Sequence, residues 1–107
     1  MNNGFDEVIH QPVRLRIMAT LAARPAGDPV DFPWLKRMLS LTDGNLGAHL
    51  LTLEKAGYVT MEKSFVDRRP KTSVTLSPTG RAAFIRHVAS LEAILTGAVG
   101  DESKIED

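Results

Sequence analysis

Apolar positions recur at helical spacing in the first half of the chain. Between residues 13 and 23 they place Val13, Ile17 and Leu21 on one side of a helix, and Arg14 and Arg16 off that side. A loop rich in glycine and proline, ARPAGDP, comes next. Apolar spacing resumes in WLKRML and again in TDGNLGAHLLTLEKAGYV. The pattern predicts three consecutive helices.

Cap residues mark the ends of the second and third helices. Asp31 suits the N-cap of the second helix, and Thr42 suits the N-cap of the third. Residues 40–41 are a connection too short for anything but a tight corner between the two helices. Gly57 is well placed to end the third helix.

After Gly57 the apolar period changes from helical to alternating. In YVTMEKSFV the side chains of Val59, Met61 and Phe65 fall on one side, and the stretch TSVTL returns Val74 and Leu76 to the core. The polar and basic segment VDRRPK lies between them. We therefore predict a β-hairpin with a basic tip.

The last helix carries a seam of apolar residues. Ser77 and Pro78 suit its cap and first position, and it extends to about residue 96, roughly 28 Å at 1.5 Å per residue. The seam consists of Phe84, Val88, Leu91 and Leu95. It predicts packing along another helix, either the same helix of a second copy or the first helix of its own chain.

Length and composition indicate one ordinary domain. The chain has 107 residues and no cysteine, which excludes disulfides and thiolate metal sites. We expect a single domain over residues 1–107, with a core at about 9–76, a last helix at 77–96 and an acidic tail at 97–107. The first ten residues do not resemble a signal peptide, and no segment is long enough to cross a bilayer. A cytoplasmic protein without membrane contact is expected.

Charge is unevenly distributed along a chain of zero net charge. Residues 36–71 hold seven bases and four acids, a net of +3, and residues 92–107 hold five acids and one lysine, a net of −4. A basic middle favours a nucleic-acid partner. The alternative is that both regions are solvated surface.

The third helix has one leucine face and one small, polar face. Leu46, Leu50 and Leu53 fall within about 60° of each other, and Gly44 and Ala48 lie opposite them. Each glycine inside a helix costs roughly 1 kcal/mol relative to alanine. Small residues allow close approach to a partner surface such as a DNA groove. The alternative is that they accommodate a neighbouring helix.

Two stretches resemble winged helix–turn–helix transcriptional regulators, in particular the small single-domain group related to MarR- and ArsR-like repressors. They are IHQPVRLRIMATL and LTDGNLGAHLLTLEKAGYVTMEKSFVDRRPKTSVTLSPTGRAAF, which span residues 9–84. The resemblance implies a mainly α fold with a small β-hairpin (α+β), that is, a three-helix core, a two-stranded wing and a long C-terminal helix. It also implies sequence-specific binding of double-stranded DNA by a homodimeric transcriptional regulator.

The resemblance assigns roles to particular residues. The helix that starts at Thr42 would be the recognition helix in the major groove, and the hairpin would be a wing on phosphate or the minor groove. The candidate recognition residues are Thr42, Asp43, Asn45, Ala48, His49, Thr52 and Lys55. The candidate wing residues are Lys63, Arg68, Arg69 and Lys71. The implied dimer interface consists of Phe84, Val88, Leu91 and Leu95.

Other function classes have less support. The chain lacks a glycine-rich phosphate loop and a nucleophile motif, and His10, His49 and His87 lack metal-ligand spacing, so we expect no enzyme, no metal site and no cofactor. A winged-helix module that binds protein instead of DNA is the main alternative. A small-molecule effector between the last helix and the three-helix core is a further possibility.

Overall fold

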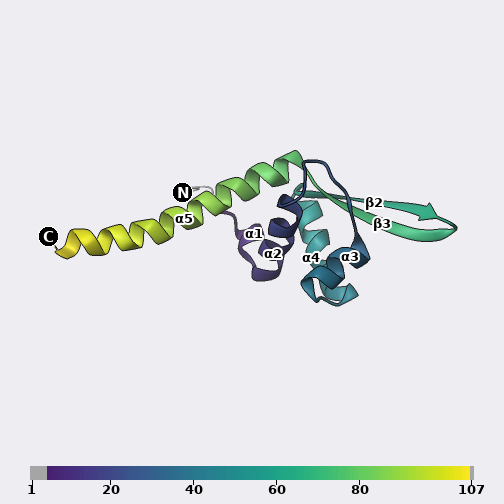
Figure 1. The fold of residues 1–107 in the computed structure, drawn as a ribbon, viewed down its shortest axis with the longest axis horizontal. Helices are drawn as coiled ribbons and strands as arrows, with labels where there is room; N and C mark the ends of the chain where they lie inside the picture. The colour runs from purple at the N-terminus through teal and green to yellow at the C-terminus, as the bar shows by residue number, and fades with distance from the viewer. Residues whose placement is uncertain (1–4, 107) are drawn as a thin grey trace.

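The computed structural model describes residues 5–106, with side chains as far as residue 97. The elements are α1 (Glu7–His10), α2 (Pro12–Ala22), β1 (Val30–Asp31), α3 (Phe32–Leu39), α4 (Asp43–Lys55), β2 (Val59–Val66), β3 (Arg69–Leu76) and α5 (Pro78–Glu106). The predicted order of three helices, a hairpin and a long helix is confirmed (Figure 1). The sequence patterns missed α1 and β1, which are the two shortest elements.

The predicted caps of α4 are present. The hydroxyl of Thr42 accepts a hydrogen bond from the Asn45 amide at 3.1 Å, which satisfies one of the free N–H groups of the first turn. At the other end Gly57 adopts a φ of 83°, and the Tyr58 amide donates to the Leu53 carbonyl at 2.9 Å. A left-handed residue followed by this backward bond is a common helix terminator, and glycine adopts it without strain.

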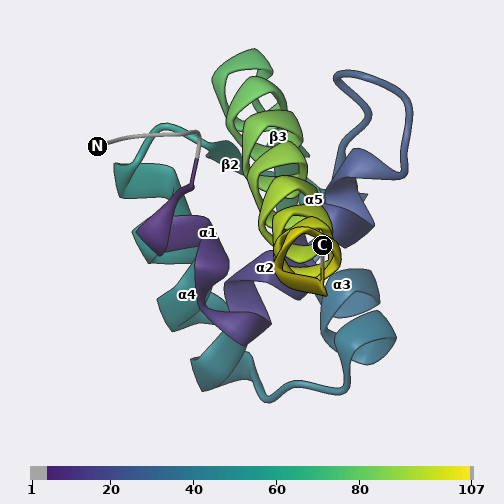
Figure 2. The same cartoon turned by 90° about the vertical axis from the view of Figure 1, so that its left-hand side faces the viewer.

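One hydrophobic core joins the helices to the base of the sheet. Its fully buried members include the three leucines of α4. The core residues are Ile9, Ile17, Met18, Leu21, Val30, Leu35, Leu39, Leu46, Leu50, Leu53, Val59, Val74, Leu76 and Ala83. Figure 2 looks along α5 and shows α1 and α4 on one side of it and α3 on the other. The leucine face of α4 therefore points inward, as predicted.

The sheet has three antiparallel strands in the order β1-β3-β2, where only two were predicted. The added strand pairs Val30 with Val74 across β1 and β3. A two-residue strand has no period of its own, and it exists because β3 offers it backbone partners. At the far end the hairpin turns through Asp67 and Arg68, which have φ values of 52° and 66°. Two positive φ values identify the tight type of turn that matches the twist of a hairpin.

The hairpin packs on the core only at its base. Val59 is buried and Met61 is half-buried, whereas Phe65 is 75% exposed. The predicted alternation is present, because Phe65 shares the side of Val59 and Met61, but nothing covers that side at Phe65. Figure 1 shows the outer part of the hairpin extending past the helices.

Helix α5 is longer than predicted. We expected it to end at about residue 96, and it continues to Glu106, which accounts for much of the 68 Å long axis of the molecule. Gly97 and Gly100 weaken a helix but do not stop it, and no proline follows them. The predicted acidic tail at 97–107 therefore has a helical backbone to Glu106. Its side chains from residue 98 on lie outside the described residues.

His87 attaches the N-terminal segment to α5. The backbone amide of Asp6 donates to Nδ1 of this buried imidazole at 3.0 Å. The Asp6 carboxylate accepts from the Val8 and Ile9 amides, which caps α1, and also from the Tyr58 hydroxyl. Because Nδ1 accepts a hydrogen bond, His87 is neutral and carries its proton on Nε2. Among the described residues, that Nε2 is the buried side-chain nitrogen without a partner.

We expect this joint to make stability depend on acidity. Burial, and then the neighbouring His10 imidazole, lower the pKa of His87 from 6.5, although Asp6 and Glu7 act in the opposite direction. The unfolded chain then binds a proton at a higher pH than the folded chain does. The contribution of His87 to the free energy of unfolding should be fully present above pH 6.5, and it should be lost as the pH falls through the lowered pKa. Urea midpoints between about pH 7.5 and 5.5 measure this slope.

An asparagine at position 87 is the matched control for that measurement. The amide oxygen of Asn can take the place of Nδ1 as acceptor for the Asp6 amide, and it does not titrate. His87→Asn should therefore have a flatter dependence of the urea midpoint on pH. An unchanged slope in His87→Asn would assign the acid sensitivity to another group.

Candidate nucleic-acid interface

The corner between α3 and α4 is held by backbone hydrogen bonds and one arginine. Ser40 adopts the left-handed conformation, with φ 55° and ψ 49°, and the Leu41 amide donates to the Lys36 carbonyl at 3.1 Å. The Arg16 guanidinium donates to the Leu39 carbonyl at 3.1 Å. Sequence reasoning placed Arg16 off the core face but did not identify this role. The corner sets the angle at which α4 leaves the body.

The face of α4 opposite its buried leucines, Leu46, Leu50 and Leu53, is open. His49 and Thr52 are half-buried at its edge. The exposed residues are Thr42, Asp43, Gly44, Asn45, Ala48, Leu51 and Lys55. The structure thus gathers the candidate recognition residues on one side of one helix, as the helical projection predicts.

Several polar groups on this face already have partners. The Asp43 carboxylate lies 2.9 Å from Nζ of Lys36, so the acid at the start of α4 is neutralised by α3. The Thr52 hydroxyl donates to the Ala48 carbonyl of its own helix at 3.3 Å. The Asn45 side chain has no hydrogen bond within the described part of the chain. Its amide is therefore free to pair with an external donor and acceptor.

The two glycines of α4 are not required by the packing of the chain. A Cβ atom built at Gly44 or at Gly47 meets nothing within 4 Å. The alternative that these small residues accommodate a neighbouring helix is therefore wrong. Alanine would raise helix stability at either position by about 1 kcal/mol. Space is thus left open on the exposed side of α4 at a cost in stability.

The cations of the hairpin are distributed over both of its faces. In the register of β2 with β3, Lys63 shares the face of Met61, whereas Lys71 and Arg69 lie on the other face. Lys71 is 3.3 Å from the Asp31 carboxylate, which forms this bridge instead of capping α3. Within the described residues the remaining hairpin bases have no ion-pair partner. The structure does not gather the four candidate wing residues into one patch.

Arg68 occupies a strained position at the hairpin tip. Its φ of 66° lies in the left-handed region, where glycine is the favoured residue at this place in the turn. A side chain there costs about 1 kcal/mol. Backbone strain of this kind is commonly retained at functional positions. The tip thus carries a cation where glycine would be more stable.

The predicted dimer residues of α5 fall into two groups. Phe84 packs partly on the core of its own chain, and Val88 and Leu91 are half-buried. Leu95 is 69% exposed and the adjacent Ile94 is 56% exposed. Figure 1 shows this part of α5 extending away from the body. Three of the four seam residues are therefore partly covered by their own chain, and Leu95 is uncovered.

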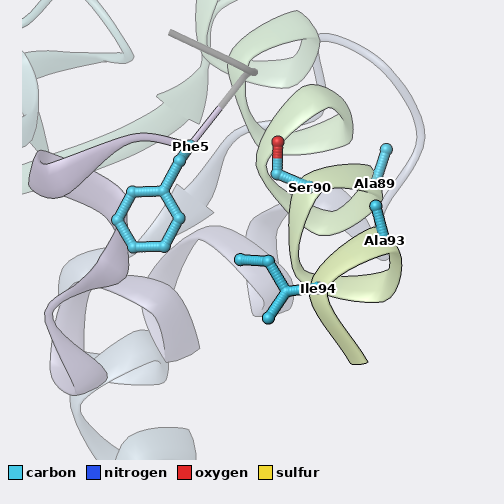
Figure 3. Close-up of a pocket in the computed structure, with 5 residues that line it drawn as sticks. All are labelled: Phe5, Ala89, Ser90, Ala93 and Ile94. Carbon is cyan, nitrogen blue, oxygen red and sulfur yellow. The ribbon is translucent and has the colours of Figure 1, made fainter. Parts of the chain in front are cut away.

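A hollow of about 330 Å³ lies between the N-terminal segment and α5. Phe5 forms one wall, and Ala89, Ser90, Ala93 and Ile94 of α5 form the other (Figure 3). Like the effector site considered from the sequence, the hollow borders the last helix, but its other wall is the N-terminal segment and not the three-helix core. Within residues 5–97 no three His, Cys, Asp or Glu side chains come together as a metal site. None of the described helices is both long and apolar enough for a membrane span.

The chain is similar to a family model, to a curated protein and to several solved structures. A family model described as a winged helix DNA-binding domain matches residues 13–95. An uncharacterized protein of Methanocaldococcus jannaschii is 37% identical over 82 residues, which are 77% of this chain and 86% of that protein. A transcriptional regulator homologue from Pyrococcus horikoshii has a solved structure with 34% identity and a TM-score of 0.79, covering 87% of this chain and 89% of that one. Reduced AbfR bound to DNA has 26% identity and a TM-score of 0.58, covering 90% and 70%.

Proposed function

Because this chain belongs to the family of winged helix DNA-binding domains, we propose that it regulates transcription by binding specific sequences of double-stranded DNA as a homodimer. The chain is a DNA-binding protein rather than an enzyme. In the proposed complex α4 lies in the major groove, and the β2–β3 hairpin contacts phosphates and the adjacent minor groove.

The observation that carries the proposal is the exposed face of α4. It combines a free Asn45 amide, open space at Gly44 and, at its edge, the methyl group of the half-buried Thr52. An asparagine amide can pair bidentately with adenine, and a methyl group can contact the methyl of thymine. At Gly44, where the helix has no Cβ atom, its backbone can approach the bases closely.

The distribution of cations on the hairpin supports the second half of the proposal. A hairpin with bases on both faces and at its tip suits a minor groove, which has a phosphate backbone on each side. The arginine in the strained turn would stand at the deepest point. Counterion release at these phosphates would supply much of the affinity and make it salt-dependent.

A dimer is proposed because one module reaches too few base pairs. Single DNA-binding modules bury little surface, and two-fold copies read half-sites about 34–36 Å apart. The uncovered apolar residues Ile94 and Leu95 support an interface on the outer half of α5. An effector in the hollow beside Phe5 would lie next to that interface.

Removing the charge of the hairpin tip tests the DNA contact. We expect Arg68→Gly combined with Arg69→Ala to weaken binding to all duplexes and to flatten the salt dependence of the dimer by up to about 4 in its logarithmic slope, because two cations are lost from each copy. Glycine relieves the left-handed strain at position 68, so the variant should not be less stable than the parent. Fluorescence anisotropy on a random duplex pool, over a series of salt concentrations, measures both quantities.

Arg86→Ala is the control for the hairpin variant. Arg86 is exposed on α5 and belongs to neither α4 nor the hairpin, so its loss should leave the salt slope nearly unchanged. If the parent and the hairpin variant have the same salt slope of duplex binding, the hairpin does not contact DNA. Absence of duplex binding at the lowest salt, together with co-purification of a partner chain, would favour the alternative of a protein-binding module.

Adding a methyl group at position 44 tests close approach by α4. Gly44→Ala should stabilise the fold by about 1 kcal/mol and weaken DNA binding about 10-fold, because the Cβ would hold the helix away from the bases. Gly47→Ala is the matched control, since it gives the same gain in stability on the flank of the helix. Urea denaturation and anisotropy measure the two effects. If Gly44→Ala binds DNA as the parent does, close approach is not the reason for the glycine.

A further inference from the structure

His49 on α4 is supported from behind by Arg14 on α2. The terminal nitrogen NH1 of Arg14 lies 3.3 Å from Nδ1 of His49, and Nε of the same guanidinium donates to the Val8 carbonyl at 2.6 Å. One arginine therefore connects α1, α2 and α4. Helices α1 and α4 are in contact, and Figure 2 shows them next to each other.

This contact determines the protonation state of the imidazole. A guanidinium has five N–H donors and no acceptor, so Nδ1 of His49 must be the acceptor in its contact with Arg14. The proton of the neutral ring then sits on Nε2. Partial burial, and then the positive charge of Arg14, lower the pKa of His49, which keeps the ring neutral near pH 7. Among the described residues, Arg14 is the charged group that shifts the pKa of His49.

The outer edge of the ring remains available. Nε2 of His49 has no hydrogen-bond partner among the described residues. It is also not a buried unpaired atom, since in the described part of the chain Nε2 of His87 is the one such side-chain atom. Nε2 of His49 therefore reaches solvent. It does so at the border of the exposed α4 face, one turn after Asn45 and one turn before Thr52. His49 thus offers one neutral N–H donor beside the groups proposed to meet the bases.

We infer that Arg14 is a positioning residue, which holds His49 as a neutral Nε2–H donor to an acceptor on a base edge in the major groove. The inference rests on the proposed function. The acceptors available there are purine N7, guanine O6 and thymine O4. A neutral donor releases no counterion, so its contribution is to sequence preference and not to the salt slope. Sequence reasoning included His49 among the recognition residues but had no signal for Arg14, which is 35 residues away.

Two substitutions at position 49 separate base reading from packing. Duplexes are first selected from a random pool with the parent protein. His49→Leu should lose about 10-fold in affinity for the selected duplex and lose its preference at one base pair, with random-pool binding and salt slope unchanged. His49→Gln, whose amide can present an N–H near the place of Nε2, should keep that preference. Retention of the preference by His49→Leu would overturn the inference.

The role of Arg14 is tested by the pH dependence of binding. In Arg14→Met the ring of His49 is free to take up a proton, so affinity for all duplexes should rise relative to the parent as the pH falls below about 6.5, and the base preference should weaken. Arg14→Met with His49→Gln should lose this rise. His10 and His87 are present in all three proteins, so the difference isolates His49.

The outcomes distinguish the inference from the function on which it rests. Arg14→Met that keeps the parent's base preference and pH profile would show that Arg14 does not position His49. Urea denaturation shows whether Arg14→Met has a folding defect. If it has, His49→Leu and His49→Gln alone decide whether His49 reads the base. If no protein in the set binds any duplex, the proposed function itself is wrong.

Discussion

Replacing Gly80 with alanine is expected to destabilise the fold by about 3 kcal/mol or more, although alanine is the better helix former. A Cβ at this position would lie 2.1 Å from the Tyr58 carbonyl oxygen and 2.8 Å from its carbon. These are backbone atoms, which cannot rotate away. The same carbonyl accepts the Ser77 amide at 3.0 Å, and the Gly80 amide donates to the Ser77 hydroxyl at 2.9 Å. The start of α5 is therefore held tightly against the start of β2.

Gly97→Ala on the same helix is the control for Gly80→Ala. A Cβ at Gly97 meets nothing within 4 Å, so alanine there should stabilise the fold by up to about 1 kcal/mol. Urea denaturation of both variants measures the difference. Equal stability of the two would mean that α5 moves away from β2 without loss, and that the contact at Tyr58 does not hold it.

Placing carboxylates on the uncovered part of α5 is expected to separate the proposed dimer. Ile94→Asp combined with Leu95→Asp should give a monomer by light scattering and lower the affinity for a two-half-site duplex about 100-fold, since binding of the second half-site is no longer linked to the first. Both side chains are more than half exposed in the single chain, so their replacement should leave its fold intact.

Arg86→Asp is the control for the dimer variant. It changes the net charge by the same two units, at an exposed position of α5 nearer the body. The control should remain a dimer and keep most of its affinity. A dimer that survives the double substitution at 94 and 95 would place the interface elsewhere, and an unchanged affinity in a monomer would separate DNA binding from dimerisation.

The sequence alone was sufficient for the elements whose signals are local. A cap acts on amides within three residues of it, so Thr42 and Gly57 could be identified as helix ends from the residues around them. The inward face of α4 was also predictable, because three leucines at helical spacing have a single way to be buried together. Together with the alternating period after Gly57, these features predicted the helix order, the hairpin and the exposed face proposed to bind DNA.

Only the tertiary structure decided the features that depend on distant partners. The pairing of β1 with β3, the support of His49 by Arg14 and the approach of Gly80 to Tyr58 each join residues far apart in the chain. The exposure of Phe65 depended on where the helices end beneath the hairpin. Periodicity reports which side of an element a residue occupies, but not whether another element covers that side. The physical reason is that hydrogen bonds and steric contacts act over a few ångströms in space, whatever the separation along the sequence.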